Sequence, residues 1–118
     1  MSSFQITFPS PGESFSIDSV IEANGNHSLE IDSFIWAVLR DTYGHYYLQN
    51  PPVSMKPDGN WHAKNIHLGE EIIEITFVKA TTTGNEHFLR KVENHDWGGF
   101  DEFPLGTEQI GSVSINVN

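Results

Sequence analysis

The chain has 118 residues, which suffices for one hydrophobic core but not for two ordinary domains, so we expect a single domain over residues 1–118. It has no cysteine, which excludes disulfide bonds and cysteine-ligated zinc, and its formal net charge of −10 opposes binding to nucleic-acid phosphates. No segment approaches the roughly 20 apolar residues of a membrane-spanning helix, and we therefore expect no membrane insertion.

Alternating apolar and polar residues predict strands from the start of the chain. FQITF (4–8) has the period-2 pattern of a half-buried strand, and the Pro-Ser-Pro-Gly that follows ends it, because proline cannot donate a ladder hydrogen bond. A second strand is expected within 14–25, centred on 20–23 and closed by Asn-Gly-Asn.

Residues 33–41, SFIWAVLRD, form the strongest predicted strand. Both of its faces are apolar, with Phe34, Trp36 and Val38 on one side and Ile35, Ala37 and Leu39 on the other. Such a strand is expected at the centre of a sheet that is covered on both faces.

The middle of the chain is expected to contain a hairpin, an edge segment and a further strand. DTYG predicts a turn with Gly44 in the left-handed conformation, and 45–49 would be the returning strand. NPPVSM (50–55) is expected at an edge, because Pro51 and Pro52 forbid central pairing, and 60–68 is the next strand.

The last third of the chain changes character after one more strand, 70–81. In that strand we expect an inner and an outer face, with Ile73, Ile75 and Phe77 inward, Glu74 and Thr76 outward, and Ile72 and Val78 partly covered on the outer side. A short helix or helical turn is predicted over 86–93 with Asn85 as its N-cap, followed by a loop over 94–107 and a terminal strand over 108–117.

About seven short strands separated by Gly and Pro turns predict an all-β fold. We expect a single antiparallel sandwich of two sheets, with a short helical turn and a long loop before the last strand. A small barrel, such as an OB-type barrel, is the alternative.

Three stretches resemble the immunoglobulin-like (fibronectin-III-like) accessory domains of bacterial multidomain proteins. They are ITFPSPGESF…VIEANG, IWAVLRDTYGHYYLQNPPV and DGNW, and the matching positions are Ser10, Pro11, Gly12, Gly25, Trp36, Asp58, Gly59 and Trp61. The likeness covers roughly 4–80, but the chain lacks a cysteine pair between sheets and a tyrosine corner, and 82–107 looks like an insertion. The resemblance implies an immunoglobulin-like sandwich and an accessory binding module rather than a catalytic domain.

The loop ENHDWGGFDEFPLG carries the densest group of candidate binding residues. Trp97 and Phe100 could stack on sugar rings, while Asp101 and Glu102 could accept hydrogen bonds from hydroxyl groups. The alternative is that aromatic side chains of this loop turn inward and plug the end of the sandwich. The direction in which Trp97 and Phe100 point therefore decides between a binding site and a plug.

Metal and catalytic patterns are weak. No two of the six histidines have the i, i+2 or i, i+4 spacing of a local zinc pair. Asn94, Asp96, Asp101 and Glu102 could offer oxygens to calcium, but their order fits no EF-hand, and acids in a loop are more often simply solvated. No G-x-S-x-G, H-E-x-x-H or P-loop pattern occurs, and we expect no cofactor, no metal and no enzymatic activity.

These observations favour a non-catalytic binding module that contacts a protein partner or a neighbouring domain of its parent protein. The alternative is a carbohydrate-binding module that uses Trp97, Phe100, Asp101 and Glu102. For either kind of module we expect no nucleic-acid partner, because the acidic charge repels phosphate groups.

Overall fold

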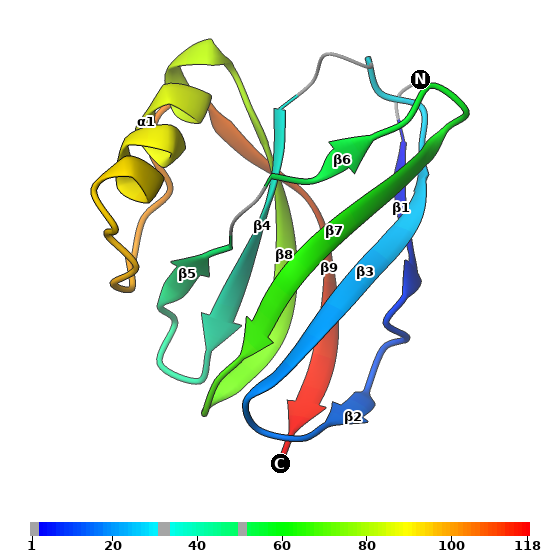
Figure 1. The fold of residues 1–118 in the computed structure, drawn as a ribbon, viewed down its shortest axis with the longest axis vertical. Helices are drawn as coiled ribbons and strands as arrows, with labels where there is room; N and C mark the ends of the chain where they lie inside the picture. Colours follow the sequence, from blue (N-terminus) through cyan, green and yellow to red (C-terminus); the bar gives the residue numbers. More distant parts are fainter. Residues whose placement is uncertain (1–2, 31–33, 50–51) are drawn as a thin grey trace.

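Two β-sheets pack face to face in the computed structural model, which describes residues 3–30, 34–49 and 52–118 (Figure 1). In chain order the elements are β1 (Phe4–Phe8), β2 (Glu13–Phe15), β3 (Ser19–His27), β4 (Phe34–Asp41), β5 (Tyr46–Leu48), β6 (Ser54–Met55), β7 (Asn60–Leu68), β8 (Ile72–Ala80), α1 (Thr82–Glu93) and β9 (Thr107–Val117). The prediction of a mostly β fold with two sheets is confirmed. In the described part of the chain, no helix is long and apolar enough to cross a membrane.

Within the described residues, the two sheets have four and five strands, in the orders β1-β3-β7-β6 and β2-β9-β8-β4-β5. β2 runs parallel to β9, with Glu13 beside Ile115, whereas the other paired strands are antiparallel. The expectation of a purely antiparallel sandwich is therefore wrong, and the second sheet is mixed. β2 continues the course of β1 beyond the turn at Gly12, so it meets β9 running in the same direction (Figure 1).

The single strand predicted within 14–25 is two strands in different sheets. Asp18 separates them with a positive φ of 68°, and its N–H donates a 2.8 Å hydrogen bond to the carbonyl of Leu68. The strand count is accordingly higher than the expected seven. β6 lies at a sheet edge, as predicted for this segment, although Pro51 is outside the described residues.

The main core lies between the two sheets and is built around aromatic rings. Trp61 stacks on Phe4 with ring centroids 4.7 Å apart, and its indole N–H donates a 3.0 Å hydrogen bond to the carbonyl of Gln5. Buried residues from both sheets, and Val53 just before β6, complete it: Ala23, Ile35, Ala37, Leu39, Val53, Ala63, Ile66, Leu68, Ile72, Ile75, Phe77, Val113 and Ile115.

A second apolar cluster covers the outer face of the five-stranded sheet. Strands β4 and β8 contribute Trp36, Val38, Val78 and Ala80, α1 contributes Phe88, and the segment after the helix adds half-buried Phe100 and Phe103. Strand β4 is therefore buried on both faces, which confirms the expectation drawn from its two apolar sides. In Figure 1, α1 and the chain that follows it form an outer layer beside β4 and β5.

The helix α1 begins earlier than predicted, with Thr81 as its N-cap. The Thr81 side chain accepts a hydrogen bond from the N–H of Gly84. Asn85, expected at the cap, instead lies within the helix and uses its Oδ1 to accept a 2.8 Å hydrogen bond from the indole N–H of Trp36. The buried indole needs an acceptor, and this tertiary contact outweighs the preference of asparagine for helix ends.

Strand β8 departs from simple alternation at its start. Asp41 is paired with Ile72 and Arg40 with Glu74, so Ile73 is an extra residue in the ladder. Because of this bulge, the side chain of Ile72 points into the main core and that of Ile73 is exposed. The prediction that Ile73 faces inward is therefore wrong. Ile75 and Phe77 face inward as expected.

Candidate functional site

A groove of about 550 Å³ is lined by residues of β5, the end of β7 and the turn after β7. Its floor consists of Leu39, Leu48 and Ile72, which are almost fully buried. Trp97 and Tyr47 add aromatic side chains to the lining. The volume lies in the range of small-ligand and peptide side-chain pockets.

Trp97 is the most accessible aromatic residue of the groove. Its exposed fraction is 43%, whereas Trp36 and Trp61 are buried at 0% and 1%. Trp97 therefore contributes to the groove lining and keeps much of its surface in contact with solvent.

The polar rim of the groove carries two carboxylates, Asp18 and Glu70, and His67. His67 Nε2 lies 3.4 Å from Asp18 Oδ1. Gln49 also lines the groove, but its amide is already used: Oε1 accepts from the backbone N–H of His67 at 3.0 Å, and Nε2 donates to the carbonyls of Tyr47 and Leu48. Gln49 thus fixes β5 to β7 across the groove and has little capacity left for a ligand.

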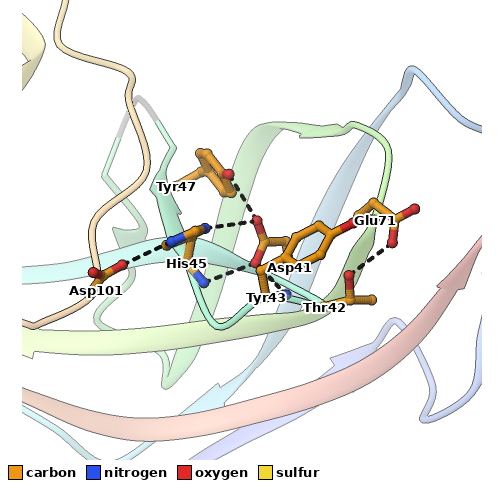
Figure 2. A network of polar contacts seen from close by, with 7 residues as sticks. All are labelled: Asp41, Thr42, Tyr43, His45, Tyr47, Glu71 and Asp101. Atoms are coloured by element: carbon orange, nitrogen blue, oxygen red, sulfur yellow. Dashed lines mark hydrogen bonds and ion pairs between the residues drawn. The ribbon is translucent and has the colours of Figure 1, made fainter.

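A buried carboxylate, Asp41, holds the tyrosine of the groove (Figure 2). Asp41 is 5% exposed, and its Oδ1 accepts 2.9 Å hydrogen bonds from the backbone N–H groups of Tyr43 and His45. Its Oδ2 accepts a 2.9 Å hydrogen bond from the hydroxyl of Tyr47. Every oxygen of the buried carboxylate is therefore satisfied, and both the hairpin turn and the Tyr47 ring are fixed.

These hydrogen bonds set the ionisation of both partners. Burial of Asp41 acts to raise its pKa, but the hydrogen bonds from the backbone of His45, from the Tyr47 hydroxyl and from the backbone of Tyr43 outweigh burial, so the pKa of Asp41 is lowered. The hydrogen bond to Asp41 raises the pKa of Tyr47 above its ordinary value of 10.0. Asp41 is therefore ionised and Tyr47 neutral at neutral pH.

His45 joins the hairpin to the loop that carries Trp97. Its Nε2 lies 3.1 Å from Asp101 Oδ1, and its Nδ1 lies 3.6 Å from Asp41 Oδ2 (Figure 2). On the far side of the hairpin, the Thr42 hydroxyl donates a 2.8 Å hydrogen bond to Glu71 Oε2. Together these contacts connect the turn between β4 and β5 to two neighbouring segments.

The loop approaches the hairpin closely because it has a glycine at 99. A Cβ atom at Gly99 would lie 2.9 Å from Cε1 of Tyr47, whereas one at Gly98 would meet only Asp96 Oδ1, at 3.7 Å. The absence of a side chain at 99 therefore lets the backbone lie against the Tyr47 ring, two residues after Trp97.

The four residues predicted as a site are not brought together. Trp97 lines the groove, but Phe100 is half-buried in the outer cluster, where its backbone exchanges two hydrogen bonds of 2.8 and 2.9 Å with Tyr46. Asp101 pairs with His45, and Glu102 borders a separate pocket of about 210 Å³ next to α1. Trp97 thus points toward a groove, whereas Phe100 anchors the loop on the outer face of the sheet rather than at its end.

The acids of the loop do not form a cation site in the described structure. Asp96 Oδ2 lies 3.3 Å from Lys91 Nζ, and Asp101 lies against His45. Among the residues with described positions, no group of three or more His, Asp or Glu side chains is close enough to hold a metal ion. The described side chains therefore include no cluster of His, Asp or Glu that would support calcium binding by the loop.

The sequence did not single out most of the groove. Asp18, Tyr47 and the pair His67 and Glu70 come from three segments that only the tertiary fold brings together. The hairpin predicted around DTYG and the loop with Trp97 were the local patterns in this region.

Comparison with known proteins gave no match: no family model, no curated protein and no solved structure was found to be similar to the chain. The groove is the feature of the molecule that bears on function. Its apolar floor, its accessible tryptophan and its acidic rim are the features that bear on a ligand.

Proposed function

We propose that the protein is an immunoglobulin-like, non-catalytic binding module that contacts a protein partner through the groove at Trp97. The strand order supports the fold assignment. β1-β3-β7-β6 corresponds to the A-B-E-D sheet of immunoglobulin domains, and β9-β8-β4 corresponds to the G-F-C sheet, with β5 in the C′ position. The helix α1 and the loop after it then occupy the F–G connection.

Two features depart from typical immunoglobulin domains. Trp36, on the strand that corresponds to C, faces the outer cluster rather than the core between the sheets. The core tryptophan is instead Trp61, on β7. The outer layer, which covers the sheet face that Trp36 occupies, accounts for this difference.

The observation that carries the binding proposal is the accessible Trp97 at the edge of an apolar groove. Large aromatic side chains are usually buried, and a tryptophan left accessible beside a pocket is typical of interaction sites. Trp97 has no ring partner among the aromatic pairs of the described residues, whereas Trp36 and Trp61 each have one or more. Trp97 therefore lacks the aromatic packing that holds the other two tryptophans in place.

Carbohydrate binding is the second candidate, supported by the aromatic surfaces of Trp97 and Tyr47 in one groove. The site would differ from the one predicted from sequence. Phe100 is half-buried in the outer cluster, and Asp101 and Glu102 do not line the groove.

The test selects ligands for the whole chain and asks whether they need Trp97. A phage-displayed random peptide library is panned on the protein, and the selected peptides are mapped on it by ¹H–¹⁵N NMR titration. We expect peptides that shift groove resonances and bind at least about tenfold more weakly to Trp97→Ala, since hot-spot tryptophans contribute 2 kcal/mol or more.

The matched control is Leu105→Ala, an apolar residue of the same segment that is 89% exposed and does not line the groove. It should leave binding unchanged. A glycan array is probed in parallel, and Trp97-dependent sugar binding without peptide binding would establish the second candidate instead. Selected peptides that bind elsewhere, with equal affinity for Trp97→Ala, would refute the groove as the binding site.

A further inference from the structure

We infer that the groove takes a basic segment of the partner protein, in which a Lys or Arg stands next to an apolar residue. This inference rests on the proposed function, because it names the chemistry of the partner at the same site. It follows from the charge of the rim, the shape of the floor and the state of the polar groups in the groove.

The described rim of the groove carries two carboxylates and no Lys or Arg side chain. Asp18 and Glu70 are exposed carboxylates, and the side chain of Asp18 is 78% accessible. Among the described lining residues His67 is the only basic group, and it is paired with Asp18. Among the described residues that line the groove, none is Lys or Arg.

The six Lys and Arg residues of the chain are placed elsewhere. They are Arg40, Lys56, Lys64, Lys79, Arg90 and Lys91. Lys91 pairs with Asp96 and lies over the ring of Phe100, 5.3 Å from its centroid. With a net charge of −10, the protein therefore attracts a cationic partner to this rim and repels an anionic one.

The interior of the groove suits the rest of a basic side chain. Lys and Arg carry long apolar stems below their charged ends, and the floor of Leu39, Leu48 and Ile72 offers an apolar surface for such a stem. The accessible ring of Trp97 can receive a cation over its face. Among the aromatic side chains, tryptophan makes the most favourable contact of this kind. The remaining volume accommodates an adjacent apolar side chain.

The polar groups of the groove favour this partner over a neutral sugar. Sugar recognition needs amides and carboxylates with free hydrogen-bonding capacity, yet the amide of Gln49 is occupied on both sides by the backbone. The rim then offers mainly carboxylates, and these act as acceptors. Ammonium and guanidinium groups are donors without acceptors, and so they match this rim.

The experiment examines the composition of the Trp97-dependent peptides selected from the phage library. We expect them to be enriched in Lys or Arg beside an apolar residue, relative to the unselected library. Synthetic versions with each Lys or Arg replaced by Gln should bind about tenfold or more weakly, and raising the salt concentration from 50 to 500 mM should weaken the parent peptides several-fold, because surface charges are screened.

A charge-matched pair of double variants locates the effect on the protein. Asp18→Asn with Glu70→Gln should weaken the basic peptides about three- to tenfold. Glu30→Gln with Glu86→Gln removes the same charge from exposed positions that do not line the groove, and should change affinity much less. Equal losses in the two double variants would show a general charge effect and overturn the assignment to this rim.

The other outcomes separate the two proposals. Trp97-dependent peptides that are neutral or acidic, with no salt dependence, overturn the basic partner and leave the binding groove standing. Groove resonances that respond to oligosaccharides of the glycan array but to no peptide also overturn it. If no ligand depends on Trp97, the proposed function falls together with this inference.

Discussion

The indole N–H of Trp36 donates a 2.8 Å hydrogen bond to Oδ1 of Asn85, which connects β4, an interior strand of the five-stranded sheet, to the helix 49 residues later. Trp36 is fully buried, and its ring lies 5.5 Å from that of Phe88 on the same helix. The outer layer is therefore fixed to the sheet by a specific polar contact as well as by apolar packing. The loop with Trp97 starts from this fixed helix.

Replacing Asn85 should destabilise the fold through the indole of Trp36. Asn85→Leu keeps a side chain of similar size but leaves a buried N–H without its acceptor, so we expect the free energy of unfolding to fall by about 1–3 kcal/mol. Urea denaturation followed by circular dichroism measures it. Glu86→Ala, the next residue and exposed, should stay within about 0.5 kcal/mol of the wild type, and equal effects of the two changes would contradict the role of the hydrogen bond.

A substitution at Gly25 tests how closely β1 and β3 approach at Trp61. A Cβ atom there would lie 1.9 Å from the carbonyl oxygen of Gln5, which accepts the indole N–H of Trp61. Gly25→Ala should therefore lower the free energy of unfolding by about 3 kcal/mol or more, since backbone and core must both move. Gly69→Ala, where the new Cβ meets nothing within 4 Å, is the control and should have little effect in the same urea titration.

Local pattern was sufficient for the strands and for the coverage of β4. Its two apolar faces predicted the two clusters that the structure contains, because alternation directly reports which sides of a strand are buried. The parallel pairing of β2 with β9 could not be predicted in this way, since a 3-residue strand carries almost no pattern. The bulge at Ile73 was also missed, because the two adjacent isoleucines, Ile72 and Ile73, fit more than one register.

Of the four residues predicted to bind a ligand, Trp97 is the one that lines the groove. Trp97 was singled out because its ring could stack on a sugar. The adjacent Phe100 was placed with it by sequence proximity, but the turn of the loop sends it into the outer cluster. The acidic rim depends on contacts between residues about 50 positions apart, such as Asp18 and His67, which no local pattern reveals.

The low pKa of Asp41 predicts how the stability depends on pH. An Asp whose folded pKa lies below its ordinary value of 3.8 binds fewer protons in the folded state, so its contribution is present above about pH 3.8 and is lost as the pH falls through the folded pKa. We expect Asp41→Asn to be less stable than the wild type at pH 6, with the difference shrinking as the solution is acidified below pH 3.8.

Urea titrations at a series of pH values measure this difference. The exposed Glu30→Gln variant removes the same charge and controls for general electrostatic effects. A difference between wild type and Asp41→Asn that stays constant down to pH 2 would show that the Asp41 hydrogen bonds do not favour the ionised form.

The position of Trp97 should depend on the glycine two residues after it. The Tyr47 ring cannot easily yield to a new Cβ at 99, because its hydroxyl is bound to the buried Asp41. Gly99→Ala should therefore displace the loop, shift the indole ¹H–¹⁵N resonance of Trp97 and cost about 1–3 kcal/mol of unfolding free energy. Gly98→Ala, whose Cβ would make only an ordinary contact at 3.7 Å, should leave the Trp97 resonance and the free energy of unfolding nearly unchanged. If Gly99→Ala also left the Trp97 resonance in place, the groove would not depend on the contact between this loop and Tyr47.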